Sequence, residues 1–127
     1  MSRILIVEDE PDIALGLQLD LRSEGYGVEI CADGEDASRR GREQGWDLIL
    51  LDVMLPDVNG FDILASLRKH PAFQRVPVMM ITGKATREAV LKGLAWGADG
   101  YITKPFEPDA LMTAVRTVLG LPQPARR

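Results

Sequence analysis

The chain has 127 residues, of which 46% are hydrophobic and 27% charged, and its formal net charge is -4 at pH 7. This composition predicts one soluble domain with a single sizeable core, and the acidic balance argues against direct binding to nucleic acid. No apolar run approaches the ~20 residues of a membrane span, so no membrane partner is expected. The only cysteine, Cys31, cannot form an internal disulfide. It is expected in the core, and a reducing, cytoplasmic location fits it.

Apolar runs and helical patterns alternate five times along the chain. The apolar runs predict strands at 3–7, 27–31, 47–51, 76–81 and 100–103. The helical patterns predict helices from Pro11 to Gly25 and at 35–44, 61–70, 86–96 and 108–119. Five strand–helix units of this length predict an α/β fold in which a parallel sheet lies between helices. Residues 1–120 are expected to form this domain, and 121–127 a short tail or the start of a linker.

Polar residues stand at the carboxyl ends of four of the five predicted strands. They are Glu8 and Asp9 after the first strand, Asp52 after the third, Thr82 after the fourth and Lys104 after the fifth. In an open parallel sheet, ligands bind outside the carboxyl ends of the strands, where the strand order reverses. If the first and third strands are neighbours, three carboxylates, a hydroxyl and an ammonium meet in one crevice. Any one of these residues alone could be a solvated loop residue, but together they predict a functional site.

Three carboxylates within a few ångströms of one another require a counter-charge. Oxygen ligands without a nearby histidine or cysteine favour a hard cation, and Mg²⁺ is expected because it also binds phosphate oxygens. The expected ligands are Asp9, Asp52 and a backbone carbonyl just past Asp52, that of Met54. Glu8 would act directly or through water. Asp52 is then placed as the nucleophile of a phosphoryl transfer, as carboxylates are in aspartyl-phosphate chemistry.

Two further side chains suit that chemistry. Phosphoryl transfer depends mainly on positioning and on neutralising oxygen charge, which Lys104 and Mg²⁺ can do together. The hydroxyl of Thr82 can donate a hydrogen bond to a phosphoryl oxygen. The residues therefore predict a site at which Asp52 becomes phosphorylated.

Four stretches of the chain match, in order, the motifs of one known family. They read "ILIVEDE", "DLILLDVMLPDVNGFDIL", "PVMMITGKA" and "GADGYITKPF". In these stretches the chain resembles the response-regulator receiver domain of bacterial two-component signalling, over residues 3 to 119. The resemblance implies a (βα)5 fold, with a doubly wound parallel sheet of five strands in the flavodoxin-like order 2-1-3-4-5. It also implies that Asp52 is the phosphoacceptor and is phosphorylated by a sensor histidine kinase or a phosphotransfer protein.

The same resemblance implies roles for the charged residues around Asp52. Glu8 and Asp9 match the acidic pair of the family. Two aspartates are commoner in that pair, so Glu8 is expected to support Mg²⁺ binding with a longer side chain. Lys104 matches the lysine that binds the phosphoryl group. The bond from Lys104 to Pro105 matches a peptide bond that is usually cis, a geometry that is cheap only before proline.

Three more residues match the switch of the family. The hydroxyl of Thr82 would move to the phosphoryl group, Gly83 would leave room for that group, and Tyr101 would swing inward afterwards. Phosphorylation would thereby favour one of two states and reposition the face formed by the fourth helix, fifth strand and fifth helix. An output domain or a partner protein is expected to dock on that face.

Weaker expectations attach to five residues. Met54 and Lys84 lie beside the expected path of the hydrolytic water, where they either tune dephosphorylation or are ordinary surface residues. Trp96 either belongs to the partner face or packs on a neighbouring helix end. Ala110 and Ala114 stand where receivers that dimerise to bind DNA tend to carry charges, so a monomer or a weak dimer is expected.

Three other functions fit parts of the sequence. A haloacid-dehalogenase-like phosphatase needs a second acid two residues after its nucleophile, where this chain has Met54. A flavodoxin-like FMN carrier needs a Ser/Thr/Gly-rich phosphate loop after the first strand, where this chain has "EDEPD". A receiver-like interaction module that is never phosphorylated stays open as the alternative. The preferred interpretation is a signalling switch and not an enzyme, because its only chemistry is on itself.

Overall fold

The computed structural model describes residues 2–40, 45–69, 75–83, 87–95, 97–104 and 106–121. Strands and helices alternate throughout these residues. The strands are β1 Arg3–Val7, β2 Gly27–Cys31, β3 Leu48–Asp52, β4 Val78–Thr82 and β5 Gly100–Thr103. The helices are α1 Pro11–Ser23, α2 Gly34–Arg40, α3 Gly60–Lys69, α4 Arg87–Ala95 and α5 Pro108–Leu119. Every element expected from the sequence is present, and β1, β2, β5 and α5 have the expected bounds.

The predicted ends of β3 and β4 were wrong. We expected β3 to stop at residue 51, but its ladder includes Asp52, whose backbone pairs with Ile81. We expected β4 to begin at residue 76, but it begins at Val78, because Pro77 has no N–H to donate. The carbonyl of Pro77 still accepts a hydrogen bond from Ile49 N at 2.9 Å. Polar side chains and apolar runs mark strand ends poorly, since pairing of the backbone defines them.

Smaller differences concern the starts of two helices. The structure begins α2 at Gly34 and α3 at Gly60, one residue earlier than expected in each case. Helix α4 is described from Arg87 onward, so its expected start at 86 lies outside the described residues. The expected far ends at 41–44, 70 and 96 lie outside the described residues, as do the predicted site residues Lys84, Trp96 and Pro105.

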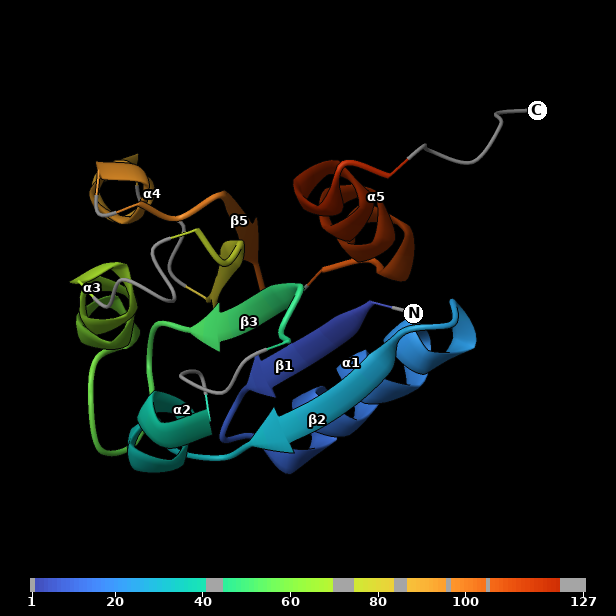
Figure 1. Cartoon of the computed structure of the whole chain (residues 1–127), viewed down its shortest axis with the longest axis horizontal. Coiled ribbons are helices and arrows are strands. Elements are labelled where there is room, and N and C mark those ends of the chain that lie inside the picture. The colour runs from blue at the N-terminus through green and yellow to red at the C-terminus, as the bar shows by residue number, and fades with distance from the viewer. Residues whose placement is uncertain are drawn as a thin grey trace.

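The five strands form one parallel sheet in the order β2-β1-β3-β4-β5, as the family resemblance implied (Figure 1). The chain passes from β1 outward to β2 and then returns to the other side of β1 as β3. The strand order therefore reverses between β1 and β3, which are paired with Ile6 opposite Leu50. This reversal leaves a crevice at the carboxyl ends of the two strands, because the helices that follow them depart to opposite faces.

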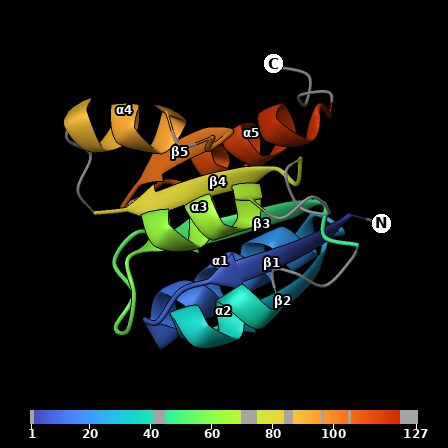
Figure 2. The ribbon, with the colours of Figure 1, turned by 60° about the vertical axis from the view of Figure 1, so that its left-hand side comes forward.

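Helices cover both faces of the sheet, with α1 and α5 on one face and α2, α3 and α4 on the other (Figures 1 and 2). Successive residues of a strand point to opposite faces, so β1 places Ile4 and Ile6 toward α1 and Leu5 and Val7 toward α3. All four are at most 1% exposed. Ile49 and Leu51 of β3 and Val78 and Met80 of β4 are buried in the same way. Cys31 is buried as well, as expected.

The packing of Trp46 shows that this residue is structural. Its indole Nε1 donates a hydrogen bond to the carbonyl of Arg40 at 2.7 Å, and the Arg3 guanidinium lies over its ring at 4.4 Å. Among the described helices, none has the length and apolar character needed to cross a membrane.

Candidate functional site

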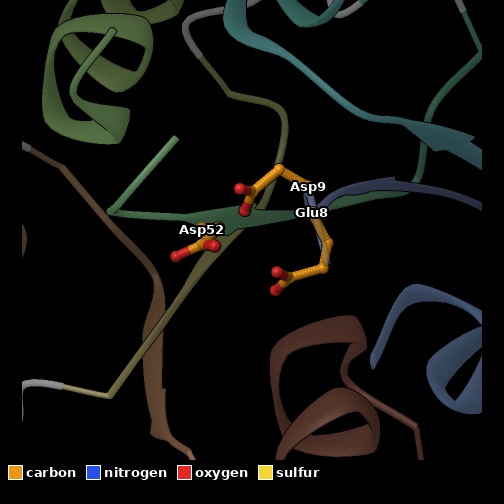
Figure 3. A group of neighbouring side chains, drawn as sticks. All are labelled: Glu8, Asp9 and Asp52. Carbon is orange, nitrogen blue, oxygen red and sulfur yellow. The ribbon is translucent and has the colours of Figure 1, made fainter. Parts of the chain in front are cut away.

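Three carboxylates converge at the carboxyl ends of β1 and β3. Glu8 and Asp9 directly follow β1, and Asp52 is the last residue of β3. One oxygen of each carboxylate lies within 4.8 Å of the others. Figure 3 shows the Asp9 carboxylate pointing toward Asp52, while the Glu8 side chain extends to the side of the sheet on which α5 lies. The prediction that strand ends would bring these three residues together is confirmed.

Lys104, which follows β5, supplies positive charge to this group. Its Nζ lies 2.7 Å from Glu8 Oε2 and 3.2 Å from Asp52 Oδ2, and it also lies 3.6 Å from Glu10 Oε1. The side chains of Glu8 and Asp52 are buried, whereas Glu10 is mostly exposed. In the described part of the chain, every salt bridge at this site comes from Lys104. One ammonium therefore serves two buried carboxylates.

Burial and the charge of Asp52 raise the pKa of Glu8 from 4.5 to about 7, against the opposing effect of Lys104. Burial works against the charge of Lys104 as well, but its contacts with Glu8 and Asp52 outweigh that effect and raise its pKa. The ammonium therefore stays charged near neutral pH, while Glu8 holds a proton more readily than an exposed glutamate. The site carries more negative charge than Lys104 can neutralise.

These residues fit a hard divalent cation. The donors are carboxylate oxygens, with no histidine or cysteine among the three residues of the cluster, and such a set favours Mg²⁺ over softer metals. Glu8 is at most 1% exposed, and a buried carboxylate whose charge is only partly compensated is costly without a cation. The sequence-based expectation of Mg²⁺ is therefore consistent with the donor set and with its electrostatics.

The loop from β3 to α3, residues 53–59, borders the carboxylates. Met54 N donates a hydrogen bond to Asp52 Oδ1 at 3.0 Å, and Met54 forms an isolated antiparallel bridge with Asn59. The Met54 side chain is exposed, with 56% of its surface accessible. A Cβ on Gly60 would lie 2.2 Å from the Asp52 carbonyl oxygen, so the chain can pass behind the carboxylate only because residue 60 is glycine.

The remaining predicted residues lie around the same edge of the sheet. Thr82 is the last residue of β4 and its backbone pairs with Thr103 of β5. The structure describes the backbone of Thr82 and not its side chain. Gly83 follows it, and a Cβ built there would meet nothing within 4 Å. Tyr101 lies in β5, half-buried against the core beneath α3. A Cβ on Gly93 of α4 would lie 3.6 Å from the Tyr101 ring, an ordinary contact distance, so the ring lies next to this helix.

Two residues near the site were missed by the sequence analysis. Glu10 contacts Lys104 from the loop before α1. Asp57 accepts hydrogen bonds from the backbone of α2, 23 and 22 residues earlier in the chain. The acidic run "EDEPD" contains Glu10 but does not single it out, and no local signal marks Asp57, because its partners are adjacent only in the fold.

An open (βα)5 sheet with a buried aspartate, an acidic pair and a lysine at its carboxyl edge defines the class of receiver domains. The profile of the response regulator receiver domain family matches residues 4–116, and the chain belongs to that family.

Particular relatives extend this assignment. The chain is 40% identical over 119 residues to the proteins named response regulator ArlR of Staphylococcus saprophyticus and Staphylococcus aureus. The match covers 94% of this chain and 53% of those proteins, so the chain spans about half the length of the curated relatives that it matches.

Solved structures show the same fold. A putative response regulator from Chloroflexus aurantiacus is 34% identical with a TM-score of 0.88, covering 94% of this chain and 98% of that one. The chemotaxis response regulator CheY4 of Vibrio cholerae is 31% identical with a TM-score of 0.88, covering 93% and 98%. The receiver domain of the sensor histidine kinase PA1611 of Pseudomonas aeruginosa, which holds a magnesium ion in its active-site cleft, is 33% identical with a TM-score of 0.86, covering 94% and 98%. The predicted family and fold class are confirmed.

Proposed function

We propose that this chain is a phosphorylation-dependent signalling switch in which Asp52 accepts a phosphoryl group from the phosphohistidine of a sensor histidine kinase or a phosphotransfer protein. The observation that carries the proposal is the placement of Asp52. It is a buried carboxylate at the end of a core strand, beside two further carboxylates and 3.2 Å from the Lys104 ammonium. A charge buried there serves no packing purpose, and its neighbours are those that phosphoryl transfer needs.

The two oxygens of Asp52 have different partners. Oδ1 accepts a hydrogen bond from Met54 N, and Oδ2 contacts Lys104. These contacts hold the carboxylate in one orientation, which lowers the entropic part of the barrier to attack. In the transfer, a bond forms between an Asp52 oxygen and phosphorus while the bond from phosphorus to the donor imidazole nitrogen breaks, and that nitrogen keeps the electron pair. Lys104 then faces the phosphoryl oxygens.

Asp9, Asp52 and the Met54 carbonyl would hold Mg²⁺, with Glu8 acting directly or through water. When bound, the ion neutralises charge on the carboxylates and on the phosphoryl oxygens. The magnesium ion in the active-site cleft of the PA1611 receiver domain supports this assignment, since that domain has the same fold and 33% identity.

The relay from the site to a partner would use Thr82 and Tyr101. Gly83 has open space beside it, which suits the approach of a phosphoryl group. The ring of Tyr101, in β5, lies next to α4, so a change in its position would alter the face formed by α4, β5 and α5. An output domain or partner protein would dock there. A role of Trp96 on this face, and a monomeric or weakly dimeric state, stay predictions.

The switch would perform phosphorylation and dephosphorylation only on itself, so it is not an enzyme acting on other substrates. The receiver-like interaction module that is never phosphorylated is the alternative. The presence of Asp52, the acidic pair and Lys104 argues against it. A cytoplasmic location stays a prediction from the family.

The test is intact-mass spectrometry after incubation with acetyl phosphate, with and without Mg²⁺. Wild type and the control Asp62→Asn, which alters an exposed carboxylate in α3, should both gain one phosphoryl adduct that depends on Mg²⁺. Asp52→Asn should gain none. No adduct on the wild type, under conditions that phosphorylate another receiver domain, would favour the unphosphorylated module.

A further inference from the structure

The loop formed by residues 53–59 is held firmly at its two ends. At the start, Val53 N donates to the Ile81 carbonyl at 3.0 Å, which continues the β3–β4 pairing. At the end, Gly60 N donates to the Val53 carbonyl at 2.8 Å, and Asn59 caps α3 by accepting from Phe61 N at 2.8 Å. The tip between these ends, residues 56–58, is exposed and contributes no buried side chain to the core.

Asp57 anchors this tip to a different part of the molecule. Its Oδ1 accepts a hydrogen bond from Gly34 N at 2.8 Å and its Oδ2 accepts one from Glu35 N at 3.0 Å. These are the first two amides of α2, so one carboxylate bridges the loop to the start of that helix. Figures 1 and 2 both show the loop between β3 and α3 passing beside α2.

The neighbouring side chain strengthens the same junction. A Cβ on Gly34 would lie 2.1 Å from Val58 Cγ2 and 3.0 Å from Asp57 Oδ1. Only a glycine at position 34 therefore lets the loop approach the helix this closely. The hydrogen bond from the Gly34 amide, with that from Glu35, lowers the pKa of Asp57, so the anchor stays ionised at neutral pH.

The helix does not need this anchor for an ordinary N-cap. Asp33 already provides one, because its Oδ1 accepts from Asp36 N at 2.8 Å and its carbonyl accepts from Ala37 N at 3.1 Å. The Asp57 carboxylate therefore makes a second set of hydrogen bonds to the same helix end. These bonds fix the position of the loop as well as that of the helix.

We infer that Asp57 is a positioning residue for the metal and phosphoryl site, which acts by fixing the loop that carries Met54. Met54 contacts the site from this loop, with its N–H on Asp52 Oδ1 and its carbonyl among the proposed Mg²⁺ ligands. The bridge between Met54 and Asn59 couples the two sides of the loop, so release of the tip would loosen both groups. The inference rests on the proposed function, because it assumes that Mg²⁺ binds there.

The experiment is a titration of ¹⁵N-labelled protein with MgCl₂, in which amide shifts give the dissociation constant. Loss of residues that orient a metal ligand typically weakens binding about 10–100-fold, and Asp57 acts one step further away, so Asp57→Ala should raise the constant by roughly 3–10-fold. Asp57→Asn retains one carbonyl acceptor and should fall between Asp57→Ala and wild type. It also serves if the alanine variant folds poorly.

Asp33→Ala is the matched control. It removes a carboxylate cap from the same helix end without touching the loop, so it should lower the thermal midpoint much as Asp57→Ala does and leave Mg²⁺ affinity within about twofold of wild type. Equal affinities for Asp57→Ala and wild type, or equal weakening by both alanine variants, would overturn the inference and reduce Asp57 to a helix cap. Absence of Mg²⁺ binding by the wild type would instead overturn the cofactor part of the proposed function, and this inference with it.

Discussion

Replacing Glu8 by glutamine should stabilise the Mg²⁺-free protein at alkaline pH and leave it unchanged at acidic pH. The pKa of Glu8 is raised from 4.5 to about 7 in the folded state, chiefly by burial. Between these two values the unfolded chain releases the proton and the folded chain retains it, so the free energy of unfolding falls as pH rises. The loss is complete above about pH 7 and absent below about pH 4.5.

The size of this effect follows from the two pKa values. Their difference, at 1.36 kcal/mol per pKa unit, corresponds to about 3 kcal/mol as an upper bound. Glutamine removes that penalty but also removes the contact of Glu8 with Lys104 at 2.7 Å, which offsets part of the gain. We therefore expect Glu8→Gln to add about 1–3 kcal/mol at pH 8 and less than about 1 kcal/mol at pH 5. For a chain of this length the gain corresponds to roughly 4–10 °C in the thermal midpoint.

Thermal unfolding followed by circular dichroism in EDTA, at pH 5 and pH 8, measures this difference. Glu10→Gln is the matched control, because Glu10 contacts the same lysine at 3.6 Å but is mostly exposed, so it should change stability by less than about 0.5 kcal/mol at either pH. A Glu8→Gln effect that is equal at the two pH values, or destabilising at pH 8, would refute the reasoning. Destabilisation at pH 8 would show that the pair with Lys104 outweighs the burial of Glu8.

Two further predictions concern stability and phosphoryl lifetime. Arg68 is largely buried, donates to two backbone carbonyls and pairs with Asp99 at 2.9 Å, so Arg68→Ala should cost about 2–4 kcal/mol in urea unfolding. Arg39→Ala, which removes a mostly exposed arginine, should cost less than about 1 kcal/mol, and equal losses would contradict this account. Met54→Asn should shorten the lifetime of the phosphorylated protein severalfold, as the adduct decays in intact-mass spectra, because a small polar side chain gives water better access to Asp52. An unchanged lifetime would remove that role of Met54.

The sequence was sufficient for the strands, the helices and the α/β class because each element carries its own local signal, whereas the strand order was implied by the family resemblance. Strand β1 is an uninterrupted apolar run, and α1 begins at a proline and is followed by Gly25, whose φ is +92°. The errors occurred where two signals compete. Asp52 is polar, as a loop residue would be, yet its backbone continues the ladder to Ile81. A sequence pattern records the side chain, whereas the hydrogen-bonded backbone determines the strand.

The site was predictable to the extent that it depends on strand ends. The carboxyl ends of parallel strands lie at one edge of the sheet, so the sequence alone predicted that Glu8, Asp52 and Lys104 would lie close together. The connections that support the site were not predictable in this way. Asp57 binds backbone amides 22 and 23 residues away, at the start of α2, and backbone groups have no residue identity that a sequence pattern could reveal.

The charge balance of the site links its stability to its proposed function. When Glu8, Asp9 and Asp52 are all ionised, the three carboxylates and the Lys104 ammonium carry a net charge of −2, which one Mg²⁺ would neutralise. The folded protein without the ion therefore retains unfavourable repulsion, and a cation that binds only the folded state relieves it and stabilises the fold by mass action. A substitution that removes the repulsion between the carboxylates should therefore also weaken the binding of Mg²⁺. Glu8→Gln should accordingly be more stable than wild type in EDTA and gain less stability from added MgCl₂.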